Sequence, residues 1–254
     1  MTSSEAPADG IPPRPVVGRL PRYAAGKPPA AVEGLASYKL SSNENPLPPL
    51  PAVVEAIARQ QDFNRYPDPL SSRLREALAE FLDVPAEDIV TGAGSLGALN
   101  QVLATFAGQN DDGKPDEVIY AWRSFEAYPI SVGLAGAESV RIPVTADGRH
   151  DLAAMAAAVT ARTKVILLCT PNNPTGPALA AAETEAFIAP CLPALWWSSM
   201  RLTRSSSGQP TPWMAWPSTA STRTWWCSAR FPKPMAWQGF GWATACPTRG
   251  SHST

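Results

Sequence analysis

The sequence predicts an α/β fold with a mostly parallel sheet, followed by a C-terminal tail of different character. Short apolar, β-rich segments alternate with segments of helical spacing, and glycine-rich or polar turns join them. The tail stands apart because eight of the nine tryptophans lie between Trp196 and Trp242, and no Asp or Glu follows Glu185. We therefore expect an organised body and an irregular tail.

Two helices and then a series of strands are expected along the body. The first helix begins at Pro51, and the second, "RLREALAEFL", has its N-cap at Ser71 or Ser72. The stretch "IVTGAGSLGALNQVLATFAG" predicts a strand, a glycine-rich turn and a helix. "EVIYAW" and "SVRIPV" are short β-rich runs, and "KVILLCTPNNPTG" is a buried strand that enters a polar loop. Strands that alternate with helices indicate parallel pairing.

Composition excludes several classes of function. Residues 1–190 carry 15 basic and 22 acidic side chains, a net charge of −7 that disfavours nucleic acid as a partner. The four cysteines form no CxxC pair and only two histidines accompany them, so we expect no metal site. No stretch approaches the roughly 18 apolar residues of a membrane span, and the N-terminus lacks the apolar run of a signal peptide. We expect a cytoplasmic protein without membrane contact.

Two turns have the residues of a ligand site. "TGAGSLGAL" places glycines at a helix start, where free N–H groups and the helix dipole favour a phosphate, although a tight turn without a ligand has the same pattern. It lacks the Lys of a P-loop. "TPNNPTGPA" presents two Asn at the carboxyl end of a strand, where open α/β sheets bind ligands; the alternative is a turn that uses Pro and Asn for backbone geometry. The aromatic residues of "YAWRSFEAYP" either cover a ligand or belong to the core. The stretch "NRYPDP" is either a ligand-contacting loop or a simple turn.

In order and spacing, "SSNENP", "NRYPD", "GAGSLGAL", "WRSFEAYP", "DGRHDL" and "CTPNNPTG" resemble the histidinol-phosphate aminotransferase family, in particular its actinobacterial branch, which includes aromatic amino acid aminotransferases. The resemblance covers roughly residues 14–187. It implies a fold-type-I enzyme that depends on pyridoxal 5'-phosphate (PLP), takes a small-molecule amino donor and a 2-oxo acid, and forms a homodimer with shared active sites.

The resemblance assigns cofactor contacts to individual residues. The backbone at Gly94, Ser95 and Leu96 would hold the cofactor phosphate. Phe125, where the family usually has Tyr, would stack on the pyridine ring, and Asn173 would hydrogen-bond the ring hydroxyl.

Two further residues are assigned to shared or substrate contacts. Tyr66 would reach the cofactor phosphate of the other subunit, and Asn45 would lie near the substrate.

Three catalytic groups of the family have no counterpart. Transamination needs a Lys that forms a Schiff base with the cofactor, an acid that pairs with the pyridinium nitrogen, and an Arg that holds the substrate carboxylate. The family carries the acid in Asp-Glu-Ala-Tyr and the Lys in Ser-Lys-Ala-Tyr, and neither motif is present. Lys233, the single lysine of the tail, lies between two prolines, unlike the family's site.

Genetic-code degeneracy offers an explanation for the tail. Read one step out of phase, the codons of Trp196–Thr203 permit Val-Val-Val-Asp-Glu-Ala-Tyr. From Trp225 the same phase permits Val-Val-Leu-Arg-Thr-Phe-Ser-Lys-Ala-Tyr-Gly. Some amino acids of the shifted reading have no alternative, because Trp and Met have one codon each. We interpret residues from about 189 as a frameshifted translation, with the shift between Ile188 and Trp196; the alternative is a natural Trp-rich interaction tail.

We therefore expect an N-terminal arm (1–38), a partial aminotransferase large domain (39–188) whose sheet has an uncovered edge, and an irregular tail (189–254). By family the activity is PLP-dependent transamination, of histidinol phosphate or an aromatic amino acid with 2-oxoglutarate, and this chain is expected to be inactive. Two alternatives stay open, a non-catalytic PLP-binding or interaction protein and a PLP lyase or decarboxylase. "WRSFEAYP" favours an aromatic substrate through the resemblance alone.

Overall fold

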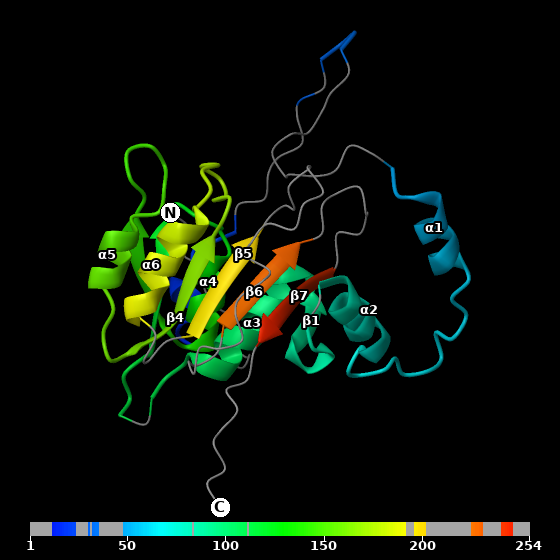
Figure 1. Ribbon diagram of the computed structural model, residues 1–254, viewed down its shortest axis with the longest axis horizontal. Coiled ribbons are helices and arrows are strands. Elements are labelled where there is room, and N and C mark those ends of the chain that lie inside the picture. Colours follow the sequence, from blue (N-terminus) through cyan, green and yellow to red (C-terminus); the bar gives the residue numbers. More distant parts are fainter. Residues whose placement is uncertain are drawn as a thin grey trace, which may run out of the picture.

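A seven-stranded sheet of order β1-β7-β6-β5-β4-β2-β3 forms the centre of the computed structural model (Figure 1). The structure describes residues 12–23, 30, 32–35, 48–82, 84–110, 112–191, 196–201, 225–230 and 240–245. The strands are β1 (Ile89–Ala93), β2 (Glu117–Trp122), β3 (Glu138–Pro143), β4 (Thr163–Cys169), β5 (Trp196–Arg201), β6 (Trp225–Arg230) and β7 (Phe240–Ala245). Only β7 runs antiparallel to its neighbours, which are β1 and β6.

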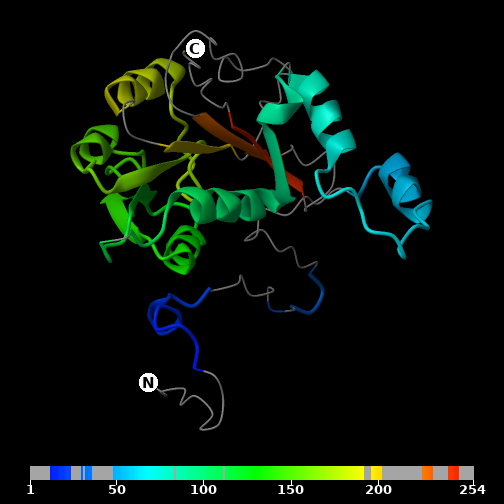
Figure 2. The ribbon, with the colours of Figure 1, turned by 90° about the horizontal axis from the view of Figure 1, so that it is seen from below.

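Helices cover both faces of this sheet. The described helices are α1 (Pro51–Ala58), α2 (Ser72–Leu82), α3 (Gly94–Phe106), α4 (Tyr128–Ala135), α5 (Leu152–Ala157) and α6 (Ala181–Cys191), with short 3-10 turns at Val17–Arg19 and Ala86–Asp88. Figure 2 shows α3 and α4 on one side of the sheet and α5 and α6 on the other. The order strand, helix, strand therefore produces the layered α/β architecture that the sequence predicts.

Alternating residues of the central strands supply two separate cores. Val118 and Tyr120 of β2 pack with α3 and α4, whereas Ile119 and Ala121 pack with α5 and α6. All four are completely buried. A strand buried on both faces reads as a continuous apolar run, which is what "EVIYAW" and "KVILLC" show. Each large apolar side chain buried in this way stabilises the fold by about 1.5–3 kcal/mol.

The predicted helices and strands of the body are confirmed, with one addition at the start of α2. The helix begins at Ser72, so Ser71 stands at the predicted N-cap position. In addition, the carboxylate of Asp68 accepts hydrogen bonds from the backbone N–H groups of Leu70 (3.0 Å) and Ser72 (2.6 Å). An Asp four residues upstream can serve because Ser71 adopts a positive φ of 51°, which turns the chain back toward it.

The prediction of an irregular tail is wrong for three segments of residues 189–254. β5, β6 and β7 pair in one sheet with the body, and β5 pairs in parallel with β4. Aromatic residues favour strands, and each of these short segments contains Trp. The absence of a two-residue period misled the prediction, because a strand in the middle of a sheet needs no alternation.

Two segments outside the layers bear on the predicted site. α1 has no buried residue, and Figure 1 shows it set apart from the sheet beyond α2. The segment between α1 and α2 includes Tyr66. Among the described residues, no helix is long and apolar enough to cross a membrane.

Candidate functional site

The loops that carry Gly94, Ser95, Leu96, Phe125 and Asn173 leave the sheet at one edge. β1, β2 and β4 all point the same way, because β1 and β6 are both antiparallel to β7, and β6 is parallel to β5 and, through it, to β4 and β2. Their carboxyl ends therefore lie along one edge. The turn 92–97, the loop 123–127 and the loop 170–177 leave the sheet there, and this is the edge at which open α/β sheets bind ligands.

The glycine-rich turn brings helix α3 directly to the end of β1. Gly94 has a positive φ of 69°, which permits the helix to start without an intervening loop. Gly92 lies so close to the helix that an added Cβ would stand 2.6 Å from the backbone nitrogen of Ala98. No side chain caps the helix at Ala93. Its first N–H groups are consequently left for a ligand, and an anion suits them best.

Ser95 adds a hydroxyl to these backbone donors. Its side chain is only 1% exposed, and its Oγ makes no hydrogen bond to any described residue. Buried hydroxyls are nearly always bonded, so an unpaired one at a helix N-terminus indicates a missing partner. Leu96, the third predicted residue, has an exposed side chain and contributes its backbone alone. These three residues together fit a phosphate group.

Phe125 has a fixed position in the loop after β2. Its ring packs edge-on against Tyr128, with the centroids 5.6 Å apart and the planes at 87°. Tyr128 in turn contacts Tyr120 at 5.4 Å. Tyr128 is fully buried, and burial raises the pKa of its phenol well above the ordinary value. The ring of Phe125 is thus held by a rigid aromatic cluster and suits stacking on a planar ligand.

The two Asn residues of the "PNNP" loop differ in role. Asn172 is buried, and its side chain bonds to Arg123, Ser124, His150 and Thr175. Asn173 is half-buried, and its side-chain amide makes no hydrogen bond within the described part of the chain. Of the two, Asn173 is therefore the residue whose side-chain amide is left for a ligand.

Sequence reasoning missed Asn172 and His150. His150 follows β3, and its Nε2 lies 3.2 Å from Asn172 Oδ1. Burial lowers the pKa of His150 below its ordinary value, and the hydrogen bond to Asn172 opposes the shift. "DGRHDL" was part of the family pattern, but nothing local shows that its His reaches a loop 22 residues away.

The structure does not join the two remaining predicted residues to this group. Tyr66 is fully exposed, so no described residue covers it. Its predicted contact is to another subunit and stays a prediction. Asn45, the predicted substrate residue, lies outside the described residues.

No described lysine lies at the ligand edge. Lys114 precedes β2 and Lys164 is the second residue of β4, so both are at the opposite, amino edge. A strand of this length spans roughly 20 Å, which a lysine side chain does not bridge. Lys233 lies outside the described residues.

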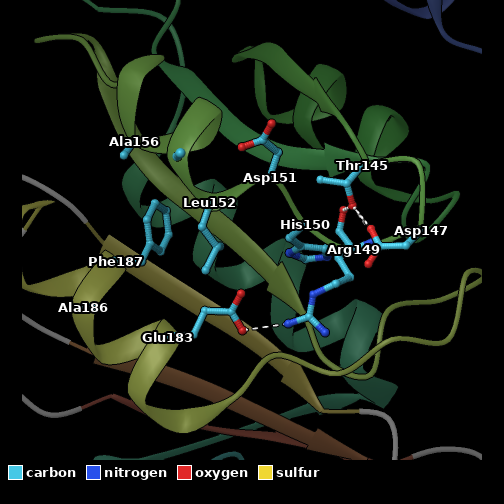
Figure 3. Close-up of a pocket in the computed structure, with 11 residues that line it drawn as sticks. Thr145, Asp147, Arg149, His150, Asp151, Leu152, Ala156, Glu183, Ala186 and Phe187 are labelled. Carbon is cyan, nitrogen blue, oxygen red and sulfur yellow. Dashed lines mark hydrogen bonds and ion pairs between the residues drawn. The ribbon is translucent and has the colours of Figure 1, made fainter.

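A separate groove lies between the loop after β3 and helices α5 and α6. Thr145, Asp147, Arg149, His150, Leu152, Glu183 and Phe187 are among the residues that line it (Figure 3). Arg149 forms an ion pair with Glu183 at 2.8 Å across it. None of the predicted cofactor residues lines this groove.

The fold and the phosphate-type turn agree with the comparisons to known proteins. A sequence profile of the family "aminotransferase class I and II" matches residues 37–192, and the chain belongs to that family. Family members depend on PLP. Ser95 and the uncapped N–H groups of α3 fit its phosphate, and the sheet is that of a fold-type-I large domain.

Two similar proteins are aromatic amino acid aminotransferases of Streptomyces species, and a third is a solved histidinol-phosphate aminotransferase. The chain is 52% identical over 170 residues to the aromatic amino acid aminotransferase of Streptomyces avermitilis (66% of this chain, 46% of the relative) and 50% identical to that of Streptomyces coelicolor over the same length and shares. The histidinol-phosphate aminotransferase of Sinorhizobium meliloti, whose structure was solved with PLP, is 25% identical with a TM-score of 0.66. The match covers 80% of this chain and 54% of the Sinorhizobium chain. The chain thus spans about half the length of the relatives it matches.

Proposed function

We propose that this chain contains the phosphate-binding part of a PLP-dependent aminotransferase for aromatic amino acids and 2-oxo acids, and that the chain as written binds PLP but does not transfer amino groups. The observation that carries the proposal is the buried, unpaired Ser95 hydroxyl beside the uncapped start of α3. The identity to aromatic amino acid aminotransferases supports the substrate class.

Each residue of the site then has a defined task. The N–H groups at the start of α3 and the Ser95 hydroxyl hold the phosphate, because they are preorganised donors in a helix dipole field. Phe125 covers one face of the ring and excludes water from it. Asn173 donates a hydrogen bond to the ring hydroxyl. When bound, PLP supplies an electron sink that stabilises negative charge at the substrate Cα.

The missing groups explain why we expect no turnover. The shifted reading places the acid of the family between Ser199 and Met200, where β5 ends, and the Lys between Pro232 and Lys233, shortly after β6. Both motifs thus coincide with the ends of strands at the ligand edge, and the family profile stops at residue 192, inside the interval proposed for the shift. These coincidences support a frameshift.

A non-catalytic PLP-binding protein is the second candidate. It is favoured by the same Ser95 site together with the position of both described lysines at the opposite edge of the sheet. For the intact aminotransferase we also propose a homodimer, in which Tyr66 of each subunit contacts the cofactor phosphate of the other. The fully exposed ring of Tyr66 is compatible with such a contact.

The site is tested by replacing Ser95 with Ala. Because the hydroxyl has no partner among the described residues, S95A is expected to leave stability unchanged while weakening PLP binding about tenfold, the effect of a hydrogen bond to a charged group. Equilibrium dialysis of PLP measures this. Ser131→Ala, a buried serine of α4, is the matched control and should bind PLP like the parent. Equal affinity of S95A and the parent would refute the phosphate site.

The reading frame is tested by sequencing independent genomic DNA across the codons of 183–244. A base inserted or deleted relative to this reading is expected. The frame-restored protein should then transfer the amino group of phenylalanine or tyrosine to 2-oxoglutarate faster than that of histidinol phosphate, whereas the chain as written should not. An unaltered frame, with a protein of this length in cells, would favour the non-catalytic function.

A further inference from the structure

We propose that His150 is a positioning residue, which holds the loop carrying Asn173 in register with the loop carrying Phe125 by donating a hydrogen bond to Asn172. The inference rests on the proposed function in one respect, namely that Asn173 and Phe125 contact PLP. The contacts that carry it are those of Asn172, a residue that touches no cofactor in this scheme.

The orientation of the Asn172 amide follows from its partners. Its Nδ2 lies 3.0 Å from the carbonyl oxygen of Arg123, which can only accept, so the nitrogen must face that side. The oxygen Oδ1 therefore faces Ser124, whose Oγ donates to it at 2.7 Å, and His150, whose Nε2 lies 3.2 Å away.

The same geometry fixes the state of the imidazole. Since Oδ1 is an acceptor, Nε2 of His150 must carry the proton and donate. Nδ1 is buried and has no partner in the part of the chain that the structure describes, so a second proton there would be an unsatisfied buried donor. His150 is consequently neutral, with its single proton on Nε2.

This arrangement ties together the loops after three neighbouring strands. Ser124 follows β2, His150 follows β3, and Asn172 follows β4. All three side chains are at least nine-tenths buried. A second link joins the last two loops, because Thr175 Oγ1 donates to the carbonyl oxygen of Gly148 at 2.7 Å.

A purely structural role explains the site less well. His150 lies beside Arg149 in the wall of the groove (Figure 3), and its buried Nδ1 has no partner among the described residues, which costs stability. An apolar residue would fill the same space without that cost. What the imidazole adds is the directed donor to Asn172, the residue immediately before Asn173.

Three variants separate donation from packing. His150→Gln keeps an N–H donor near the position of Nε2, His150→Leu fills the space without a donor, and His150→Asn keeps polarity but is too short to reach. Met155→Ala, in the adjoining helix α5, is the control for lost stability, because Met155 is fully buried in the core behind α5. All are made in the full chain.

Two readouts are measured on each variant. Hydrogen exchange by mass spectrometry follows the peptides that cover 121–128 and 168–177, and equilibrium dialysis gives the Kd for PLP. His150→Leu and His150→Asn should speed exchange in 168–177 and weaken PLP binding about fivefold, the equivalent of roughly 1 kcal/mol. His150→Gln should restore both toward the parent. Met155→Ala should lower the melting temperature without a selective change in either.

The outcomes distinguish this inference from the proposed function. If the parent binds no PLP but the exchange of 168–177 responds as stated, the proposed function fails and the positioning role stands. If the parent binds PLP and Gln, Asn and Leu behave alike in both readouts, the positioning role is overturned and the function stands. Should His150→Leu not fold, the Gln and Asn pair decides, since both are polar and differ in reach.

Discussion

Gly92 offers the sharpest test of how the ligand edge is built. Alanine at this position would place Cβ 2.6 Å from Ala98 N and 3.0 Å from Gly97 C, both backbone atoms that no rotamer change can move. Ordinary contact begins at 3.4 Å, so the first turn of α3 must shift by about 0.8 Å. Forcing an extra methyl into a packed site costs about 1–3 kcal/mol, and we expect G92A to lose that much stability.

Gly97→Ala is the matched comparison on the same turn. Its Cβ would lie 3.4 Å from Ala93 Cβ, an ordinary contact, and alanine favours a helix over glycine by up to about 1 kcal/mol. G97A should therefore be neutral or stabilising. Urea denaturation followed by circular dichroism measures both variants, and dialysis adds their PLP affinity. If G92A is as stable as G97A, or binds PLP as tightly as the parent, the close approach of β1 and α3 is wrong.

Three other predictions concern single residues. Gly94→Ala should cost about 1–2 kcal/mol in urea denaturation because φ is +69°, and Gly94→Asn should cost less; equal losses would count against the left-handed turn. Burial lowers the pKa of His150, so its contribution to the free energy of unfolding is complete above the ordinary value of 6.5 and declines as the pH falls below it. His150→Gln should flatten the plot of unfolding free energy against pH in that range. An unchanged slope would contradict burial of the neutral ring. Glu117→Ala should lower the free energy of unfolding by about 2 kcal/mol, because this buried carboxylate pairs with Arg162 and accepts hydrogen bonds from the hydroxyls of Thr160 and Thr163. Glu117→Gln keeps a side-chain oxygen that can accept and should lose less. Similar denaturation midpoints for both variants would show that the acceptor is unimportant.

Local pattern was sufficient for part of the body of the fold, but it did not predict α4, α5 or α6. Helical spacing placed α1, α2 and α3, and apolar runs placed β2, β3 and β4, because each signal is contained within one segment. The tail strands were missed because their stability depends on partners far away in sequence. β7, for example, pairs Thr244 with Ile89. A short Trp-containing segment does not reveal such a partner.

The candidate site likewise has features that the sequence shows and features that depend on contacts between distant segments. The glycine turn and the Asn pair are visible as motifs, and the structure brings Ser95, Phe125 and Asn173 to one edge of the sheet. The sequence could not show which Asn is tied down, since that depends on Ser124 and His150 from other loops. Nor could it show that the Ser95 hydroxyl is buried and unpaired, because this follows from packing in three dimensions.

The antiparallel strand β7 has a consequence for how the chain matures. Among the described strands, β1 pairs with β7 alone, so the strand that leads into the turn 92–97 is joined to the rest of the described sheet through residues 240–245. During synthesis β1 leaves the ribosome about 150 residues before its partner, and it must wait unpaired for that interval. The turn 92–97 therefore gains its place in the sheet late in synthesis. Any change in residues 240–245 bears on how this turn is held, although the two segments are far apart in the sequence.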